Sequence, residues 1–310
     1  MDRQNRWTHG AVEHRAKQVP FARPLVSVVI PTYRRLDLLD RCVAAVMHQR
    51  VSFAYEVLVV EDAGMSAAGM LALIRHHEQP AVITGRRLRY LRAGQPGSPA
   101  GPAAARNVGW RSAEGIIIAF TDDDTVPDPD WLASGVAAID TGEAAAAFGL
   151  TTMPLPAVPT DYERNAAGLA GLGFITANCF VKRQALESID GFDERYRAAW
   201  REDSDLYFTL LTAGMRVVPA PEAIVVHPIR PAPWGVSIGQ QRKSQYNALL
   251  YKKYPALYRA QIQRWPPGHY YAIVISTVLA GIASVAGAGV IALFLATLAI
   301  LWIMIFVWSA

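Results

Sequence analysis

Three consecutive carboxylates, Asp122, Asp123 and Asp124, are the residues of this sequence best suited to chemistry. They follow an apolar run at 116–120, and a Pro-Asp-Pro segment at 127–129 comes directly after them. A short β-branched run that ends in turn formers predicts a buried strand of a parallel sheet, with the acids at its carboxyl end. Because adjacent carboxylates repel one another, Mg²⁺ or Mn²⁺ would stabilise the arrangement. A solvated acidic turn is the alternative.

The elements that position these acids are predicted from alternating strand and helix patterns that begin at Leu25. Apolar β-branched runs predict strands, and apolar residues spaced by three or four predict helices between them. The predicted strands cover 26–30, 56–60, 88–91 and 116–120, and the predicted helices cover 36–47, 70–80 and 103–113. This alternation predicts an α/β domain with a mostly parallel sheet and flanking helices. Ligands of such sheets bind outside the carboxyl ends of the strands, where the three acids are expected.

The second half of the chain has shorter predicted elements. They are helices at 131–139, 182–188 and 237–254, and strands at 144–150, 174–181, 215–218 and 223–226. The Pro- and Gly-rich segment 152–172 lacks periodicity, so we expect a mobile loop there. Another helix opens with Glu202, Asp203 and Asp205. Acids at a helix start complement the helix dipole, so a purely structural role is one interpretation of them.

Composition and charge narrow the class of protein. A chain of 310 residues can bury a large core, and Cys42 and Cys179 lack the spacing of a metal site or a disulfide framework. The net charge is +4, with basic residues concentrated in an N-terminal arm at 1–24. Such an arm suits nucleic acid or an anionic membrane surface, and the C-terminal sequence favours the membrane, so no nucleic acid partner is expected. The N-terminus lacks the apolar core of a cleaved signal peptide.

The C-terminal segment from Ala272 to Ala310 contains no charged residue. One transmembrane helix needs about 20 apolar residues, so we expect a transmembrane helical hairpin, with a single long tilted span as the alternative. Small residues at 286–289 suit a tight turn or a close contact between helices. Flanking aromatic and basic residues predict a cytoplasmic domain at the cell (inner) membrane. These flanking residues are Tyr270, Tyr271, Trp302, Trp308, Arg259 and Arg264.

Six motifs occur in the order and with the spacing of a known family. They are Ser-Val-Val-Ile-Pro-Thr-Tyr-Arg-Arg at 27–35, Val-Val-Glu-Asp-Ala-Gly at 59–64, Ala-Arg-Asn-Val-Gly at 105–109, Thr-Asp-Asp-Asp at 121–124, Gly-Phe-Asp-Glu at 191–194 and Arg-Glu-Asp-Ser-Asp-Leu at 201–206. From about residue 25 to 230 the chain therefore resembles the family 2 glycosyltransferases, which have the Rossmann-like GT-A fold. The resemblance implies an inverting transfer of a sugar from a nucleotide-sugar, most often a UDP-sugar, to a hydroxyl of a glycan or lipid-linked acceptor.

The resemblance implies donor-binding roles for residues after the first two strands. The first loop and the acids of the second turn would hold the base and ribose, because carboxylates accept hydrogen bonds from imide N–H groups and hydroxyls. The family more often has two aspartates where this chain has Glu61 and Asp62, which leaves open which acid meets the base. The implied donor-binding residues are Pro31, Thr32, Tyr33, Arg35, Glu61, Asp62, Arg106 and Asp123.

The resemblance also implies a metal site in the acidic motif. Asp122 and Asp124 would bind Mn²⁺ or Mg²⁺, while Asp123 would face the ribose or sugar of the donor. His227 would be a further ligand, although a lone histidine is often structural. Arg106 would neutralise the diphosphate or brace the acids, and a helix-surface arginine is the alternative.

The catalytic base implied by the resemblance is Asp203. The reaction needs a carboxylate to accept the hydroxyl proton and a cation to stabilise the departing diphosphate. Trp200, Asn178 and Glu202 would lie near the acceptor, although packing alone also explains a tryptophan. Asp205 would be structural or would contact the acceptor.

Other functions stay open. A non-catalytic nucleotide-sugar-binding membrane protein would need no base, so the acid pair Glu202-Asp203 counts against it. A nucleotidyltransferase would carry a glycine-rich loop near the first strand, which 31–35 lacks. Gln-x-x-Arg-Trp at 261–265 is typical of processive polysaccharide synthases, but Arg264 and Trp265 are interpreted as membrane-interface anchors. The expected division is the arm at 1–24, a GT-A domain at 25–234 with halves at 25–125 and 126–234, basic juxtamembrane helices at 235–269, and the membrane segment at 270–310.

Overall fold

The computed structural model describes residues 23–309, except 64–66, 84–85, 96, 141, 172, 234 and 266–267. The chain divides into two compact units, one that ends at Leu250 and one that begins at Tyr251. Residues 1–22 of the predicted basic arm lie outside the described residues. The expected division into an arm, a main domain and C-terminal helices therefore stays a prediction.

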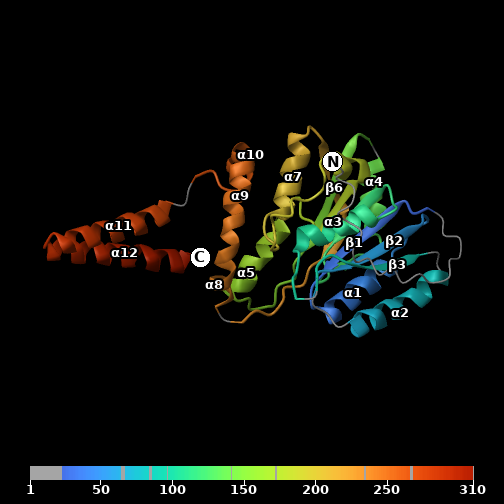
Figure 1. Cartoon of the computed structure of the whole chain (residues 1–310), viewed down its shortest axis with the longest axis horizontal. Helices are drawn as coiled ribbons and strands as arrows, with labels where there is room; N and C mark the ends of the chain where they lie inside the picture. Colours follow the sequence, from blue (N-terminus) through green and yellow to red (C-terminus); the bar gives the residue numbers. More distant parts are fainter. Residues whose placement is uncertain are drawn as a thin grey trace, which may run out of the picture. The chain divides into compact units, whose positions relative to one another are not determined.

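A mixed eight-stranded sheet forms the centre of the first unit, with strand order β3-β2-β1-β4-β7-β6-β8-β5. In Figure 1 the strands β1, β2 and β3 lie side by side at one end of this sheet. Its strands are β1 (Val26–Thr32), β2 (Tyr55–Glu61), β3 (Arg87–Arg92), β4 (Ile117–Thr121), β5 (Val126–Pro127), β6 (Ala144–Thr152), β7 (Asn178–Lys182) and β8 (Arg216–Val226). The first four strands in chain order pair in parallel, as predicted. Both β7 and β5 pair antiparallel with their neighbours. The carboxyl ends of β1, β2 and β4 therefore meet at one edge.

Helices cover both faces of this sheet. They are α1 (Leu36–Met47), α2 (Ala67–Ile83), α3 (Pro102–Ser112), α4 (Trp131–Asp140), α6 (Arg183–Ser188) and α7 (Glu202–Thr212). The helices α5 (Asp161–Ala167), α8 (Val236–Gln240) and α9 (Gln245–Lys253) complete the set up to residue 253. Within β1, Val28 and Ile30 pack in the core that contains α1, α2 and α4. The intervening Val29 packs in the core that contains α3, α6 and α7. Burial on both faces explains why the strand is continuously apolar.

Segment 152–172, predicted to be a loop, contains a helix. Thr160 caps α5: its hydroxyl accepts the Glu163 N–H at 3.3 Å, and the Glu163 carboxylate accepts the Thr160 N–H at 2.7 Å. A 3₁₀ turn at Gly168–Gly171 follows. The Thr-x-x-Glu capping box is visible in the sequence, so this helix start could have been predicted.

Two predicted strands at 215–218 and 223–226 form the single strand β8. The pairing of β8 with β6 shifts register between Gly149 and Leu150, and this shift accommodates the extra residues of β8 between the two predicted strands. A Cβ on Gly149 would lie 2.1 Å from the Ala223 carbonyl oxygen, so the close approach requires glycine. The helix predicted at 237–254 is divided into α8, a 3₁₀ turn at Gln241–Ser244, and α9.

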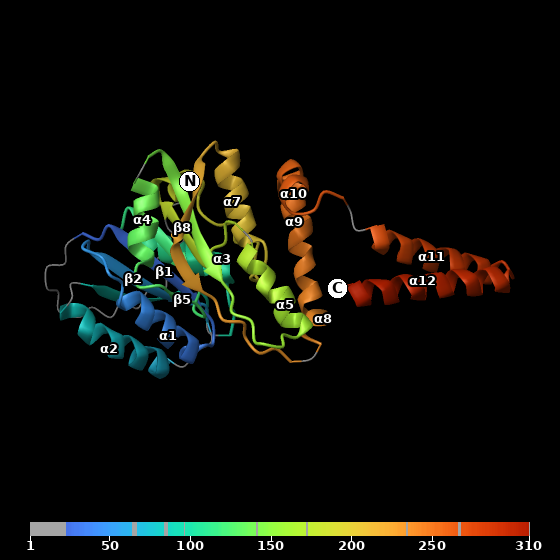
Figure 2. The same cartoon turned by 180° about the vertical axis from the view of Figure 1, so that it is seen from behind.

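The second unit contains α10 (Pro255–Gln261), α11 (Gly268–Val285) and α12 (Gly289–Ser309). In both views α11 and α12 lie side by side (Figures 1 and 2). Between them Gly287 has φ +75°, and the Ala288 N–H donates to the Ala283 carbonyl, which ends α11 at the predicted turn.

The predicted transmembrane hairpin is wrong. Among the described residues, no helix combines the length and the apolar character needed to cross a membrane. The C-terminal segment does form two helices with a turn after Val285: α11 has 18 residues and α12 has 21. The membrane-anchor roles of Arg264 and Trp265 depended on these spans and have no support.

Candidate functional site

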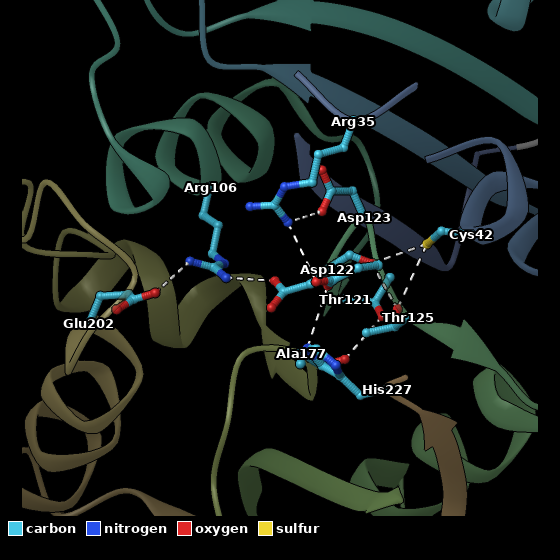
Figure 3. Close-up of polar contacts among 11 residues, drawn as sticks. Arg35, Cys42, Arg106, Thr121, Asp122, Asp123, Thr125, Ala177, Glu202 and His227 are labelled. Carbon is cyan, nitrogen blue, oxygen red and sulfur yellow. Dashed lines mark hydrogen bonds and ion pairs between the residues drawn. The ribbon is translucent and has the colours of Figure 1, made fainter. Parts of the chain in front are cut away.

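A candidate metal-binding cluster consists of Asp122, Asp124 and His227, whose potential ligand atoms all lie within 4.8 Å of one another. Figure 3 shows Asp122 and His227 of this cluster. The two acids follow β4, and the pairing of β5 with β8 brings the end of β8, where His227 lies, beside them. His227 Nε2 is 3.5 Å from Asp124 Oδ1, and among the described residues its buried Nδ1 has no hydrogen-bond partner. Carboxylate oxygens with one imidazole suit a divalent cation, so these residues fit Mn²⁺ or Mg²⁺.

The middle acid, Asp123, bonds to the loop after β1 instead. Its carboxylate accepts hydrogen bonds from Thr32 Oγ1 at 2.7 Å and from Arg35 Nη1 at 2.8 Å. Burial raises the pKa of Asp123 to about 6, although Arg35 and Thr32 act to lower it. Two predicted donor-binding residues, Thr32 and Arg35, therefore contact the acidic motif directly.

Arg106 connects the acids after β4 with those of α7. Its Nη2 lies 2.7 Å from Asp122 Oδ1, and its Nη1 lies 3.2 Å from Glu202 Oε1 (Figure 3). The side chain is only 3% exposed, so it is not a helix-surface arginine. A buried guanidinium between two carboxylates neutralises both and holds α3 against α7.

Asp203, the predicted base, lies in the first turn of α7. Arg201, which precedes the helix, has φ +72°, and this left-handed residue turns the chain into the helix. Asp203 Oδ1 accepts the Ser204 N–H at 2.6 Å. Burial raises the pKa values of both Asp203 and its neighbour Glu202, despite the attraction of Arg106. A carboxylate with a raised pKa is better suited to accept a proton.

The predicted nucleotide-binding acids have bonds within the protein. Asp62 accepts backbone N–H bonds from Ala100 at 2.6 Å and Gly101 at 2.8 Å, so it shapes the Gly/Pro-rich loop that leads into α3. Glu61 accepts a bond from Arg92 Nε at 3.0 Å and another from the Tyr90 hydroxyl. Sequence reasoning missed these partners because they come from later segments.

Pro31 lies near the end of β1, Tyr33 directly follows the strand, and both residues are partly exposed. Between Tyr33 and Arg35, Arg34 has φ +56°, and its guanidinium lies over the Tyr33 ring at 5.1 Å. The loop thus presents its backbone and aromatic ring at the sheet edge where the acids lie.

The predicted acceptor residues are not brought together on one accessible surface. Trp200 is exposed, and its indole N–H donates to Asn247 Oδ1 at 3.0 Å. Asn178 is fully buried: it accepts from Trp131 Nε1 and donates to the carbonyls of Leu150 and Ala223. The amide of Asn178 therefore joins strands inside the sheet.

One contact of the acidic motif was not predicted at all. Arg230 Nε lies 2.9 Å from Asp124 Oδ2, on the irregular segment after β8. The only signal in the sequence is its position three residues after His227.

Comparisons with known proteins identify the family of this chain. A family model described as "Glycosyl transferase family 2" matches residues 27–189, and one described as "Glycosyl transferase family group 2" matches residues 117–310. Glycosyltransferase AglE from Haloferax volcanii is 27% identical over 254 residues, which cover 78% of this chain and 74% of that protein. Hyaluronan synthase from Pasteurella multocida is 29% identical over 61% of this chain, but the match covers only 19% of the synthase.

Solved structures share the fold. A mannosyltransferase, PcManGT from Pyrobaculum calidifontis in complex with GDP-Man and Mn²⁺, has a TM-score of 0.54 at 22% identity, covering 75% of this chain and 64% of that chain. S. aureus TarS 1–349 in complex with UDP-GlcNAc has a TM-score of 0.53 at 17% identity, covering 73% and 65%. This chain therefore spans slightly less than two thirds of each solved structure.

Proposed function

Because the chain belongs to glycosyl transferase family 2, we propose that it transfers a sugar from a nucleotide-sugar donor to an acceptor hydroxyl with inversion at the anomeric carbon. The observation that carries the proposal is the bridge from the metal-binding acids to the base helix through Arg106. The similar solved structures, which hold GDP-Man with Mn²⁺ and UDP-GlcNAc, support a donor of this class.

Asp203 acts as the general base. It accepts the proton of the acceptor hydroxyl while the oxygen forms a bond to the anomeric carbon, and the bond from that carbon to the nucleoside diphosphate breaks on the opposite side. Attack from the opposite side inverts the configuration. Burial raises the pKa of Asp203, which makes the carboxylate a better proton acceptor than an exposed aspartate.

The departing diphosphate gains negative charge, and the chain offers positive charge to stabilise it. A divalent cation held by Asp122, Asp124 and His227 would supply Lewis-acid stabilisation there. Arg106 holds Asp122, which follows β4, close to Glu202 at the start of α7 by an ion pair with each carboxylate.

The donor site lies at the carboxyl ends of β1 and β2. Thr32 and Arg35 contact Asp123, so the loop after β1 is tied to the acidic motif. The Asp62 carboxylate accepts the backbone N–H groups of residues 100 and 101 and so fixes this loop as a wall of the donor site. Because both of its oxygens are used in these bonds, other residues of the site recognise the base.

The test is a thermal-shift screen of UDP-, GDP- and dTDP-sugars with and without Mn²⁺, followed by transfer assays. We expect one nucleotide class to raise the melting temperature only with the metal, since ligands that bind the folded state stabilise it. Proton NMR of the product should show the inverted anomer. If no nucleotide-sugar stabilises the chain with Mn²⁺ or Mg²⁺, or the product retains its configuration, the proposal is wrong.

A further inference from the structure

Two arginines from separate parts of the sequence lie beside Asp124, and the charges of both also act on a third cation, Lys243. Arg230 Nε lies 2.9 Å from Asp124 Oδ2, and Arg35 Nη1 lies 3.5 Å from the same oxygen. Arg35 follows β1, Arg230 follows β8, and the third cation, Lys243, belongs to the 3₁₀ turn at Gln241–Ser244. The fold therefore collects positive charge at one side of the candidate metal-binding cluster.

Burial and the nearby positive charges lower the pKa of Lys243. Partial burial lowers its pKa, and the positive charges of Arg230 and Arg35 lower it further, against the attraction of Glu202. Its amino group lies 3.4 Å from the Ala199 carbonyl and 5.9 Å from the centre of the Trp200 ring. Like charges repel one another, and a bound anion would relieve the repulsion.

Arg230 still has donors to offer such an anion. Its Nε forms an ion pair with Asp124, but in the described part of the chain its two terminal nitrogens have no hydrogen-bond partner, and its side chain is 48% exposed. A guanidinium offers five N–H donors in a planar fork that matches the oxygens of a phosphate. The bond to Asp124 also limits the orientations that this half-exposed side chain can adopt.

We propose that Arg230, oriented by Asp124 and assisted by Lys243, binds the diphosphate of the donor and stabilises it as the nucleoside diphosphate leaves. This inference rests on the proposed glycosyltransfer function. It gives the segment at 227–230 two tasks, since His227 contributes to the metal-binding cluster and Arg230 contacts the phosphates. Arg230 would be a specificity-determining residue, because it distinguishes a diphosphate from a monophosphate.

The experiment is titration calorimetry on the full chain with saturating Mn²⁺, using the nucleoside mono- and diphosphate of the base identified by the screen. Arg230→Ala should weaken diphosphate binding about 10- to 100-fold, the range expected for hydrogen bonds to charged groups. Monophosphate binding should change less than about threefold, and Mn²⁺ binding without nucleotide should persist, since the three ligand residues remain. Lys243→Ala should act in the same direction but more weakly.

Two further variants make the test specific. Arg230→Lys keeps the charge but not the fork, so it should restore part of the diphosphate affinity. Arg242→Ala removes an exposed charge from the neighbouring position and should change neither affinity. Equal weakening of mono- and diphosphate binding by Arg230→Ala, or no weakening of either, overturns the inference while the wild-type chain still binds nucleotide. A wild-type chain that binds no nucleotide overturns the proposed function itself.

Discussion

Arg106 on α3 lies 3.2 Å from Glu202 on α7, although 96 positions separate the two residues in the sequence. The same guanidinium contacts Asp122 at 2.7 Å. One buried side chain therefore joins the acids at the end of β4 to the helix that carries Asp203. Removal of the guanidinium would leave buried carboxylates without their partner.

The first prediction concerns the stability that this bridge supplies. Arg106→Met should lower the free energy of unfolding by roughly 3 to 5 kcal/mol, because removal of one member of a buried ion pair leaves the other uncompensated. Urea denaturation followed by circular dichroism measures the loss. Arg111→Met on the same helix is the control: its partner Asp190 is exposed, so the loss should stay within about 1 kcal/mol. Equal losses in the two variants would contradict the assigned burial of the bridge.

The second prediction isolates the base. Asp203→Asn keeps the size of the side chain but cannot accept the proton, so the turnover rate should fall on the order of 10² to 10⁴. Donor affinity should stay unchanged, because the donor site is built from other residues. Sugar-transfer kinetics and donor titration by calorimetry measure the two quantities.

Glu202→Gln and Asp205→Asn are the matched controls on the same helix. Glu202 is paired with Arg106, and Asp205 accepts a hydrogen bond from the Tyr196 hydroxyl at 3.0 Å, which an asparagine oxygen can also accept. Both changes should therefore reduce turnover less than Asp203→Asn does. A more damaging Asp205→Asn would show that the base is assigned to the wrong carboxylate.

The third prediction is a pH dependence. Asp203 must be deprotonated to accept a proton, and burial holds its pKa above the ordinary aspartate value. Since the group is protonated below its pKa, activity should fall as the pH decreases, and the fall should begin at a higher pH than an ordinary aspartate would give. The pH profile of kcat at saturating donor tests this. The residual activity of Asp203→Asn should lack this acid limb; an unchanged limb would mean that another group titrates.

The fourth prediction concerns the metal. Chelation with EDTA should abolish the stabilisation by donor, and Mn²⁺ or Mg²⁺ should restore it. His227→Ala should weaken Mn²⁺ binding at least about tenfold by calorimetry, since one of three candidate ligands is lost. His48→Ala is the control, because the His48 ring bonds only to the Ala44 carbonyl on an exposed helix end among the described contacts. Full donor binding in EDTA would exclude a metal requirement.

Local patterns in the sequence were sufficient for the framework of the nucleotide half. Short β-branched runs predicted β1, β2 and β4, because a strand buried on both faces must be apolar at every position. The acids after β4 were also recognisable, since the end of such a strand places them at the ligand-binding edge. The small residues at 286–289 indicated a turn or a close helix contact, and the structure has the turn, with Gly287 at φ +75°.

Two predictions made from local sequence patterns were wrong. Two short strands were predicted at 215–218 and 223–226, but the pairing of β8 with β6 continues through a shift in register. The uncharged C-terminal segment predicted membrane spans, and its turn lies where it was expected, but among the described residues no helix has the length and apolar character of a span.

By itself, the sequence determined which side chains carry charge and at which strand and helix ends they stand. Only the tertiary structure decided what each charge meets: Arg106 is buried between two carboxylates, Asp62 binds the loop before α3, and Arg230 contacts Asp124. The physical reason is that these partners lie far apart in the chain. Periodicity reports which face of an element is buried, whereas an ion pair depends on where separate elements cross, and that is set by the packing of the whole sheet and its helices.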